Sequence, residues 1–497
     1  MGNRRNDITN QERVQIASTV LSAQRAWGAV TELAKQYALS RQTIYTIAAA
    51  GKRVLLRGLV PLPHGPQVQE ATVRVDRNRL VRSVVALTEV GVSQRDIAFC
   101  LAEMLDTQVS AGWINGELAQ VEERAAQVNA AWHPDVAETL AGDEIYANGA
   151  PNLLVVGNDS LYIYALTRQQ SCDGDTWGCV LLDSPVAGHF ASDGGTGLAA
   201  GAKLADVAGH QLDWDHLLRP LWGHVTRLEK QAYAALEAVE ERAAKFDQAT
   251  TTKRLAQHLA AWERLTATAT EKVTRYDAFA RLAHEVDAQF ALIDVQTGQL
   301  QDPIAAATRL RAVGQQLHGW TGRIYEKLRR NLSNWAEGLF RYQAGLTQAL
   351  ASLRKQWGIL PLQALCRVWQ LEADAQRHPL PWAERRVRQL RWEESLDVAV
   401  AVLGPEQLWD AWEALCAVLN RVWRGSMLAE CINSLLRPIL DRRKHTDQGC
   451  LELFRFLHNV RPFQRGKRAG ASPAQLAGLD VPADPFVLLG LAPKVSS

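Results

Sequence analysis

Apolar positions recur with two different periods along the chain, and the change of period divides the chain into regions. In residues 28–55 and 87–118 apolar side chains recur three and four positions apart, which predicts short helices. Residues 142–166 are instead rich in β-branched and aromatic residues, and Asn-Gly and Gly-Asn-Asp sequences that favour turns interrupt them. This second pattern predicts three antiparallel strands, around residues 143–147, 152–156 and 160–166.

Helical periodicity dominates the rest of the chain. After the three strands, residues 175–185 predict a short helix, the sequence GHFASDGG predicts a fourth strand that ends at Asp193, and residues 196–208 predict another helix. Residues 217–425 are almost wholly helical in pattern, with tryptophans spaced as helix-packing residues. An amphipathic helix follows, with an apolar stripe on one face and Glu430 on the other, and then a basic segment.

The composition is that of a folded protein with several domains. The chain has 497 residues, of which 47% are hydrophobic and 22% charged, and a chain of this length is expected to form two to four domains. It has no apolar run of the ~18 residues that a membrane-spanning helix needs, and its N-terminus lacks the apolar segment of a signal peptide. The seven cysteines are scattered without a Cys-x-x-Cys pair, which fits a reducing cytoplasm.

The two N-terminal helical stretches have the rhythm of helix-turn-helix units, which we place at residues 1–59 and 68–130. Ala38-Leu39 is the expected turn of the first unit, and Ser40 the expected cap of its second helix. Such a unit places the N-terminal residues of its second helix in the major groove of DNA. A plain helical bundle has the same periodicity, but two tandem copies favour DNA binding. The candidate DNA contacts of the first unit are Arg41, Gln42, Thr43 and Tyr45. Those of the second unit are either Gln94 and Arg95, or Ser110, Trp113 and Asn115, depending on which of its helices enters the groove.

Basic residues gather at both ends of a chain whose net charge is only +2. Residues 1–56 hold eight Lys or Arg against three Asp or Glu, and residues 437–468 hold nine against three. Such patches are either phosphate-binding surfaces or solvated faces, and charge alone leaves both alternatives open. The C-terminal candidates for phosphate contacts are Arg442, Arg443, Lys444, Arg465, Lys467 and Arg468.

Two aspartates are expected to meet in the predicted sheet. Asp143 lies in the first strand and Asp193 ends the fourth, and a sheet of this order makes them neighbours. Glu430, on the late amphipathic helix, is the candidate for a third carboxylate. Like charges at short range oppose joint ionisation, so three carboxylates in one pocket require cations, and oxygen ligands suit Mg²⁺. The alternatives that remain are Glu144 in place of Asp143, and Glu406, Glu413 or Glu452 in place of Glu430.

In their order along the chain these features resemble a DDE transposase with an RNase H-like core. Asp143 is followed by SDGGTGL around Asp193, by Asp213-Trp214-Asp215-His216, by a long helical region and by ExxNSxLR from Glu430. In this order of motifs the chain is similar to Mutator-like and hobo/Activator-type transposases and their bacterial insertion-sequence relatives. Those proteins carry a (Cys or Asp)-x-x-His motif soon after the second Asp, and then a helical insertion. The resemblance covers roughly residues 140–216 and 426–490.

The resemblance implies a multi-domain, mostly α-helical protein around an α/β RNase H-like core. Residues 135–216 would form the first part of that core, residues 217–425 an all-helical insertion, and residues 426–497 the last core helix and a basic C-terminal segment. Asp143, Asp193 and Glu430 would bind two Mg²⁺ or Mn²⁺ ions and catalyse phosphodiester hydrolysis and strand transfer. The accessory residues would be Asp213, His216, Asn433 and Arg437.

The same resemblance implies double-stranded DNA as the partner, in the form of terminal inverted repeats and target DNA. Pairing two element ends implies a homodimer or a larger assembly, and the location would be the bacterial cytoplasm, next to the nucleoid. Three alternatives remain: a transposase-derived DNA-binding regulator, a metal-dependent nuclease that cuts without joining, and a helical scaffold without a role on DNA. In the regulator, SDGG would be an ordinary turn.

Overall fold

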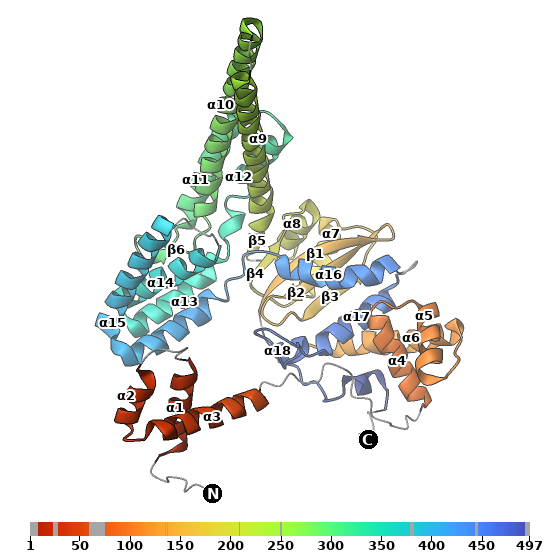
Figure 1. Cartoon of the computed structure of the whole chain (residues 1–497). Helices are drawn as coiled ribbons and strands as arrows, with labels where there is room; N and C mark the ends of the chain where they lie inside the picture. The colour runs from red at the N-terminus through yellow and green to blue at the C-terminus, as the bar shows by residue number, and fades with distance from the viewer. Residues whose placement is uncertain are drawn as a thin grey trace. The chain divides into compact units, whose positions relative to one another are not determined.

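The computed structural model describes residues 8–22, 28–58, 75–134, 136, 138–207, 209–248, 251–377, 382–442 and 446–492. The chain divides into two compact units, Met1–Arg74 and Val75–Ser497. The described part of the first unit is helical, and the second unit combines helices with a five-stranded mixed sheet (Figure 1). The prediction of a multi-domain, mostly helical protein with a smaller α/β portion is confirmed at this level.

The first unit contains three helices around a small apolar core. They are α1 (Asn10–Ser22), α2 (Ala29–Gln36) and α3 (Arg41–Gly58). Just after α2, Ala38 takes a left-handed conformation with a φ of 52°. α3 begins where the Ser40 hydroxyl accepts a hydrogen bond of 3.1 Å from the backbone amide of Thr43. The predicted turn and the predicted cap are therefore both present.

A second set of three helices opens the larger unit. They are α4 (Arg77–Glu89), α5 (Gln94–Leu105) and α6 (Ala111–Ala131). The side chains of Asp76, Ser93 and Ser110 cap them by accepting hydrogen bonds from first-turn backbone amides. The apolar faces of these helices share one core with α17 (Gln448–Val460) and the 3₁₀ helix η3 (Pro485–Leu489). The N-terminal and C-terminal parts of the larger unit are thus packed together.

The sheet has five strands in the order β3-β2-β1-β4-β5. The strands are β1 (Glu138–Ala147), β2 (Ala150–Gly157), β3 (Ile163–Arg168), β4 (Val186–Ser192) and β5 (His210–Leu212). β1, β2 and β3 pair in antiparallel fashion, whereas β4 runs parallel to β1, and β5 parallel to β4. Asn148 and Gly149 join β1 to β2 with φ values of 50° and 76°, as a tight two-residue hairpin turn requires. The three predicted antiparallel strands and the fourth strand are confirmed, although the fourth ends one residue before Asp193.

Helices cover both faces of the sheet (Figure 1). α16 (Met427–Arg442) and α17 pack on one face, while α7 (Gly174–Leu182), α8 (Thr196–Leu204) and the short α18 (Pro473–Leu476) pack on the other. Because side chains alternate along a strand, Ala141 and Ile145 of β1 belong to the core on the α16 side, and Leu140 belongs to the core on the other side. This alternation also determines the face of the sheet on which each acidic side chain of β1 lies.

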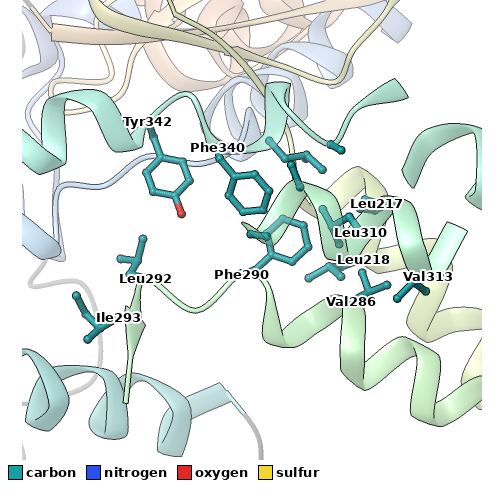
Figure 2. Packing of buried hydrophobic residues seen from close by; sticks show 14 of the residues in the cluster. Leu217, Leu218, Val286, Phe290, Leu292, Ile293, Leu310, Val313, Phe340 and Tyr342 are labelled. Carbon is teal, nitrogen blue, oxygen red and sulfur yellow. The ribbon is translucent and has the colours of Figure 1, made fainter. Parts of the chain in front are cut away.

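Between β5 and α16 the chain forms a large helical region with its own core. Its helices are α9 (Asp215–Asp247), α10 (Thr252–Ala288), α11 (Pro303–Gln316), η1 (Leu317–Gly319), α12 (Arg323–Asn334), η2 (Gly338–Phe340), α13 (Gln343–Trp357), α14 (Ile359–Arg377) and α15 (Trp382–Leu419). α9 and α10 form a long antiparallel hairpin (Figure 1). In the core, Leu217 and Leu218 of α9 lie near Phe290, whose ring stacks on that of Phe340 with centroids 5.7 Å apart (Figure 2).

The helical pattern predicted for residues 217–425 is confirmed for the described residues of this region, with one exception. The exception is a hairpin of two very short strands, β6 (Ile293–Asp294) and β7 (Gln299–Leu300). Of the helices that the structure describes, none combines the length and the apolar character needed to cross a membrane.

Candidate active site

The parallel pairing of β1 with β4 brings Asp143 and Asp193 to neighbouring positions. Ala141 of β1 is in register with Ala191 of β4, and each aspartate lies two residues further along its own segment. Asp193 is the first residue after β4. Its negative charge raises the pKa of Asp143, so the two carboxylates interact. The structure thus brings together the two aspartates that were predicted to meet.

The glycines after Asp193 form the turn that holds its carboxylate. Gly194 has a φ of 80°, a conformation that residues with a side chain rarely adopt. The Gly195 amide donates a hydrogen bond of 2.8 Å to Asp193 Oδ1. α8 begins at the next residue, without a side-chain cap. The SDGG sequence therefore presents Asp193 between the end of β4 and the start of α8.

Asp143 lies on the side of the sheet that α16 covers. Its Oδ2 accepts a hydrogen bond of 2.8 Å from Asn433 Nδ2, and its Oδ1 accepts one of 2.9 Å from the Glu144 amide. The pKa of Asp143 is raised to about 6, first by burial, then by the charge of Asp193, with a smaller contribution from Glu430. The two hydrogen bonds lower that pKa without cancelling the rise. Asn433, predicted as accessory, contacts the first aspartate directly.

Glu430 lies in the first turn of α16, and each of its carboxylate oxygens has a basic neighbour. Oε1 lies 3.6 Å from His216 Nε2, and Oε2 lies 3.5 Å from Arg219 Nη2. Both neighbours belong to the first two turns of α9. The charge of Glu430 also raises the pKa of Asp143. Glu430 therefore belongs to the same electrostatic cluster as the two aspartates.

The alternative third carboxylates lie elsewhere in the fold. Glu406 and Glu413 are on α15, within the helical region. Glu452 is on α17, where its carboxylate accepts hydrogen bonds from Asn129 Nδ2 at 2.7 Å and from Gln448 Nε2 at 2.8 Å. Among the described interactions, none joins these three glutamates to the cluster formed by the aspartates and Glu430.

Asp213 joins the start of the helical region to its end. Its buried carboxylate accepts hydrogen bonds from the amide and the hydroxyl of Ser426, at 2.8 and 2.9 Å, and from the Asp215 amide at 2.8 Å. A Cβ on Gly425 would lie 2.5 Å from Asp213 Oδ1, so only glycine fits there. Burial by itself raises the pKa of Asp213, but the close His216 imidazole and the hydrogen bonds from Ser426 and Asp215 outweigh it and leave the pKa lowered. Ser426 directly precedes α16, and this contact therefore fixes the beginning of the helix that carries Glu430.

His216 bridges this buried contact and the carboxylate cluster. Its Nδ1 lies 3.4 Å from Asp213 Oδ2, and its Nε2 faces Glu430. The close contact with the Asp213 carboxylate raises the pKa of His216 despite burial, and the charges of Asp193 and Glu430 raise it further. The Asp-x-x-His motif thus places a readily protonated imidazole beside Glu430.

Glu144 is a fourth carboxylate at this site. It follows Asp143 in β1 and so faces the opposite side of the sheet. Glu144 Oε1 and Asp193 Oδ1 lie 3.8 and 3.2 Å from the point that a Cβ on Gly195 would occupy. Glu144 Oε2 is buried and has no hydrogen-bond partner among the described residues. The pKa of Glu144 is raised to about 7, first by burial and then by the charges of Asp193 and Asp143.

The donor set suits a hard divalent cation. Asp143, Asp193 and Glu430 supply carboxylate oxygens, the ligands that Mg²⁺ prefers. The pKa of Asp143 is raised first by burial and then by the charges of Asp193 and Glu430, and a bound cation would offset that negative charge. In the described part of the chain, no three His, Cys, Asp or Glu side chains are gathered closely enough to hold a metal ion in the present arrangement.

The predicted DNA contacts of the first unit lie at the start of α3. Arg41, Gln42 and Tyr45 are exposed there, and Thr43 is bound through its amide to the Ser40 cap. This is the end of the second helix that a helix-turn-helix unit presents to DNA. The described surface of α3 is consistent with that use.

The second set of candidate DNA contacts has a less favourable setting. Gln94 Nε2 donates a hydrogen bond of 3.1 Å to Asn115 Oδ1, and Trp113 packs against the core shared with α17, while Arg95 is exposed. Ser110 serves as the cap of α6. Residues 75–131 hold five Arg and no Lys against eight Asp or Glu, so α4–α6 is acidic overall.

The C-terminal basic residues differ in their availability. Arg465 and Lys467 are exposed, as is Arg437 on α16. Arg468 is instead used within the protein, because its guanidinium donates to the carbonyl oxygens of Asn158 and Asp159 at 2.8 and 2.6 Å. Arg442 is the last residue of α16, and Arg443 and Lys444 lie outside the described residues.

No protein-family model matches the chain, and no curated protein matches it significantly.

Proposed function

We propose that this protein is a DNA transposase of the DDE type, with Asp143, Asp193 and Glu430 as its acidic triad. One observation carries the proposal. A strand, a turn and a helix from distant parts of the chain bring these three carboxylates into one cluster, in which burial first, and then the charges of Asp193 and Glu430, raise the pKa of Asp143. Clustered carboxylates of this kind are unfavourable for folding and typical of metal-dependent sites.

The surroundings of the triad support an RNase H-like core. The sheet is mixed, with three antiparallel strands followed in space by two parallel ones, and helices pack on both faces. Asp143 is on the central strand, and Asp193 follows the adjacent parallel strand. The long helical region follows β5 in the chain, and α16 after it packs on the sheet again, as the resemblance to transposases with a helical insertion implies.

Asp143, Asp193 and Glu430 would hold two Mg²⁺ or Mn²⁺ ions. When bound, the two ions activate the attacking water or 3′-hydroxyl and stabilise the leaving oxygen of the phosphodiester. The protein's own residues position the ligands. Asn433 orients the Asp143 carboxylate by a hydrogen bond, and the Gly195 amide orients that of Asp193. Asp213 fixes the start of α16, and His216 contacts Glu430.

The partner is double-stranded DNA. We assign recognition of the element ends first to α1–α3, because residues 1–56 are basic and the start of α3 exposes Arg41 and Gln42. The acidic α4–α6 set, which shares its core with α17, would hold DNA less strongly. Arg465 and Lys467 would contact phosphates near the core. Because strand transfer joins two element ends to one target, the active form would be a dimer or a larger assembly.

The test is cleavage and joining of labelled duplexes that carry the DNA flanking the coding sequence, with Mg²⁺ or Mn²⁺. Wild-type protein is compared with Asp193→Ala and with the matched control Asp183→Ala, which removes an exposed aspartate just after α7. The proposal expects wild type and Asp183→Ala to cut and join, and Asp193→Ala to bind the same duplex without reacting.

The other results assign other functions. Cutting of pre-verified ends without joining would identify a nuclease. Binding by all three proteins without any reaction would identify a DNA-binding regulator, and SDGG would then be an ordinary turn. Absence of DNA binding at low salt would overturn every function on DNA.

A further inference from the structure

Arg219 is an exposed basic side chain beside the triad. It lies in the second turn of α9. Its Nη2 forms an ion pair with Asp215 and lies 3.5 Å from Oε2 of Glu430. Neither of these pairings uses Nε or Nη1. The side chain is 62% exposed, so the guanidinium is accessible to a ligand that approaches the triad.

Folding stability gives little reason for an arginine at this position. Ion pairs between exposed side chains contribute little to the stability of a fold. The guanidinium does have a chemical property that a site for phosphodiesters uses, because its planar fork of N–H donors matches the oxygens of a phosphate. Arg219 thus has the charge, the exposure and the donor geometry of a phosphate ligand, next to the carboxylate cluster.

We propose that Arg219 binds the phosphodiester that reacts at the triad, and that its pairing with Glu430 is its position in the absence of metal and DNA. The proposal rests on the proposed transposase function, because it requires DNA at the carboxylate cluster. In the resting protein the guanidinium neutralises part of the charge of Glu430. Once Glu430 is a metal ligand, its attraction for Arg219 falls, and the guanidinium becomes available to the phosphate.

The surroundings of the two basic neighbours of Glu430 indicate which of them moves. His216 is held from its other side by the buried Asp213, and its side chain is largely enclosed. Arg219 has a longer and more exposed side chain. Its second partner, Asp215, lies one turn earlier on the same helix. Asp215 can therefore hold the Arg219 guanidinium near the site while the guanidinium leaves Glu430 and binds a phosphate.

The first experiment measures binding of an element-end duplex in Ca²⁺, at low temperature and with the duplex verified as intact afterwards. The scissile phosphate is either native or replaced by an uncharged methylphosphonate, and a second modified duplex carries the methylphosphonate one helical turn away. Wild type is compared with Arg219→Ala, with Arg219→Lys and with Arg227→Ala. Arg227→Ala is the matched control, because Arg227 is exposed on the same helix and its loss changes the charge equally.

The proposal expects the methylphosphonate at the scissile position to weaken binding by wild type about tenfold more than it weakens binding by Arg219→Ala. Arg227→Ala should respond as wild type does, and Arg219→Lys should lie between the two, because lysine keeps the charge and loses the fork. The distant methylphosphonate should affect all four proteins equally. An equal response of wild type and Arg219→Ala at the scissile position overturns the proposal.

A second measurement, without DNA, tests the resting position. Mn²⁺ binding, followed by electron paramagnetic resonance, should be about two- to fivefold tighter in Arg219→Ala than in wild type and in Arg227→Ala, since the metal no longer competes with the guanidinium for Glu430. Unchanged affinity contradicts the pairing step. Failure of the proposed function looks different, because wild type would then cut no end duplex and would not distinguish the scissile phosphate from the distant one.

Discussion

Replacing Asp213 by alanine should destabilise the larger unit more than any other single change close to the triad that spares the triad itself. The carboxylate is buried and accepts three hydrogen bonds of 2.8–2.9 Å, two from Ser426 and one from the Asp215 amide. Asp213→Ala leaves these donors without an acceptor in a buried place. A hydrogen bond to a charged group contributes about 1.5–3 kcal/mol, and breaking a buried charge network costs about 3–5 kcal/mol. We therefore expect the free energy of unfolding to fall by about 3–5 kcal/mol.

The same change should loosen the helix that carries Glu430. Ser426 precedes α16, and its carbonyl accepts a hydrogen bond of 3.1 Å from the Glu430 amide. Without Asp213, Ser426 loses the hydrogen bonds that fix its position, and the first turn of α16 becomes less ordered as a result. A displacement of about 1 Å at a reacting group can lower a rate about 100-fold. The variant that still folds should therefore bind DNA normally and react much more slowly.

Chemical unfolding followed by tryptophan fluorescence measures the stability, and hydrogen exchange of the backbone amides in residues 426–433 measures the order of the first turns of α16. Ser426→Ala is the graded control, because it removes the hydroxyl bond and keeps the amide bond, so that a loss of about 1 kcal/mol is expected. Asp183→Ala, on the surface, should change neither measurement. A loss below about 1 kcal/mol for Asp213→Ala, or unchanged exchange in α16, would refute the role assigned to Asp213.

The pH dependence of this effect has a defined sign. The pKa of Asp213 is lowered in the fold, so the fold favours the ionised carboxylate. Its contribution to stability is present above the pKa of the unfolded chain, about 4, and is lost as pH falls through the lower folded value. The difference in unfolding free energy between wild type and Asp213→Ala should therefore shrink in acid. At higher pH it should also fall as pH rises through the raised pKa of His216, because Asp213 stabilises the protonated imidazole as well.

Other perturbations test the remaining parts of the structure. The pKa of Asp143 is raised to about 6 in the metal-free protein, so the wild-type fold loses stability as pH rises from about 4 to 6. Asp143→Asn should therefore be about 1–3 kcal/mol more stable than wild type at pH 7.5 and no more stable below about pH 4. Equal thermal midpoints of the two proteins at pH 7.5 would contradict this. Arg82 is almost fully buried and paired with Asp484 at 2.6 Å, so Arg82→Ala should lower the unfolding free energy by about 3 kcal/mol, with a smaller loss in the double variant that also lacks Asp484. Reversing the charges of Arg465 and Lys467 should lower the slope of log affinity against log salt for DNA by about 2, whereas an unchanged slope excludes them as phosphate contacts.

The sequence predicted those parts of the fold that depend on local patterning. Richness in β-branched and aromatic residues, together with Asn-Gly at the β1–β2 turn, predicted the antiparallel strands, because that turn requires two left-handed residues. The meeting of Asp143 with Asp193 follows from the position of each near the end of its strand. Glu430 was distinguishable from the other glutamates because it begins the sequence ExxNSxLR. It lies opposite the apolar stripe of α16, whose Ile432 and Leu436 are buried against the sheet.

The errors come from buried polar residues whose partners lie far away in the sequence. β1 begins at Glu138, five residues before the predicted start. A glutamate is not expected inside a buried strand, but the Glu138 carboxylate is buried and accepts hydrogen bonds from Ser160 and Tyr164. β5 was missed because its central residue is Gln211, which is buried and donates to the Leu339 carbonyl at 2.9 Å. A hydrophobic pattern cannot reveal such positions, since their burial depends on partners that only the fold supplies.

The contacts of Asp213 also explain how a long helical region can lie between β5 and α16 without displacing Glu430. α9 begins two residues after Asp213, and the chain that leaves α15 returns to the same carboxylate at Ser426. Both ends of the helical region are thus attached to one buried group, and Glu430 follows four residues after the second attachment. The position of the third carboxylate is therefore set by contacts at the base of the helical region, among Asp213, His216 and Ser426, and not by the length of the helices between them. Because His216 and Arg219 lie on the first turns of α9, a movement of that helix would reach Glu430 through two direct contacts.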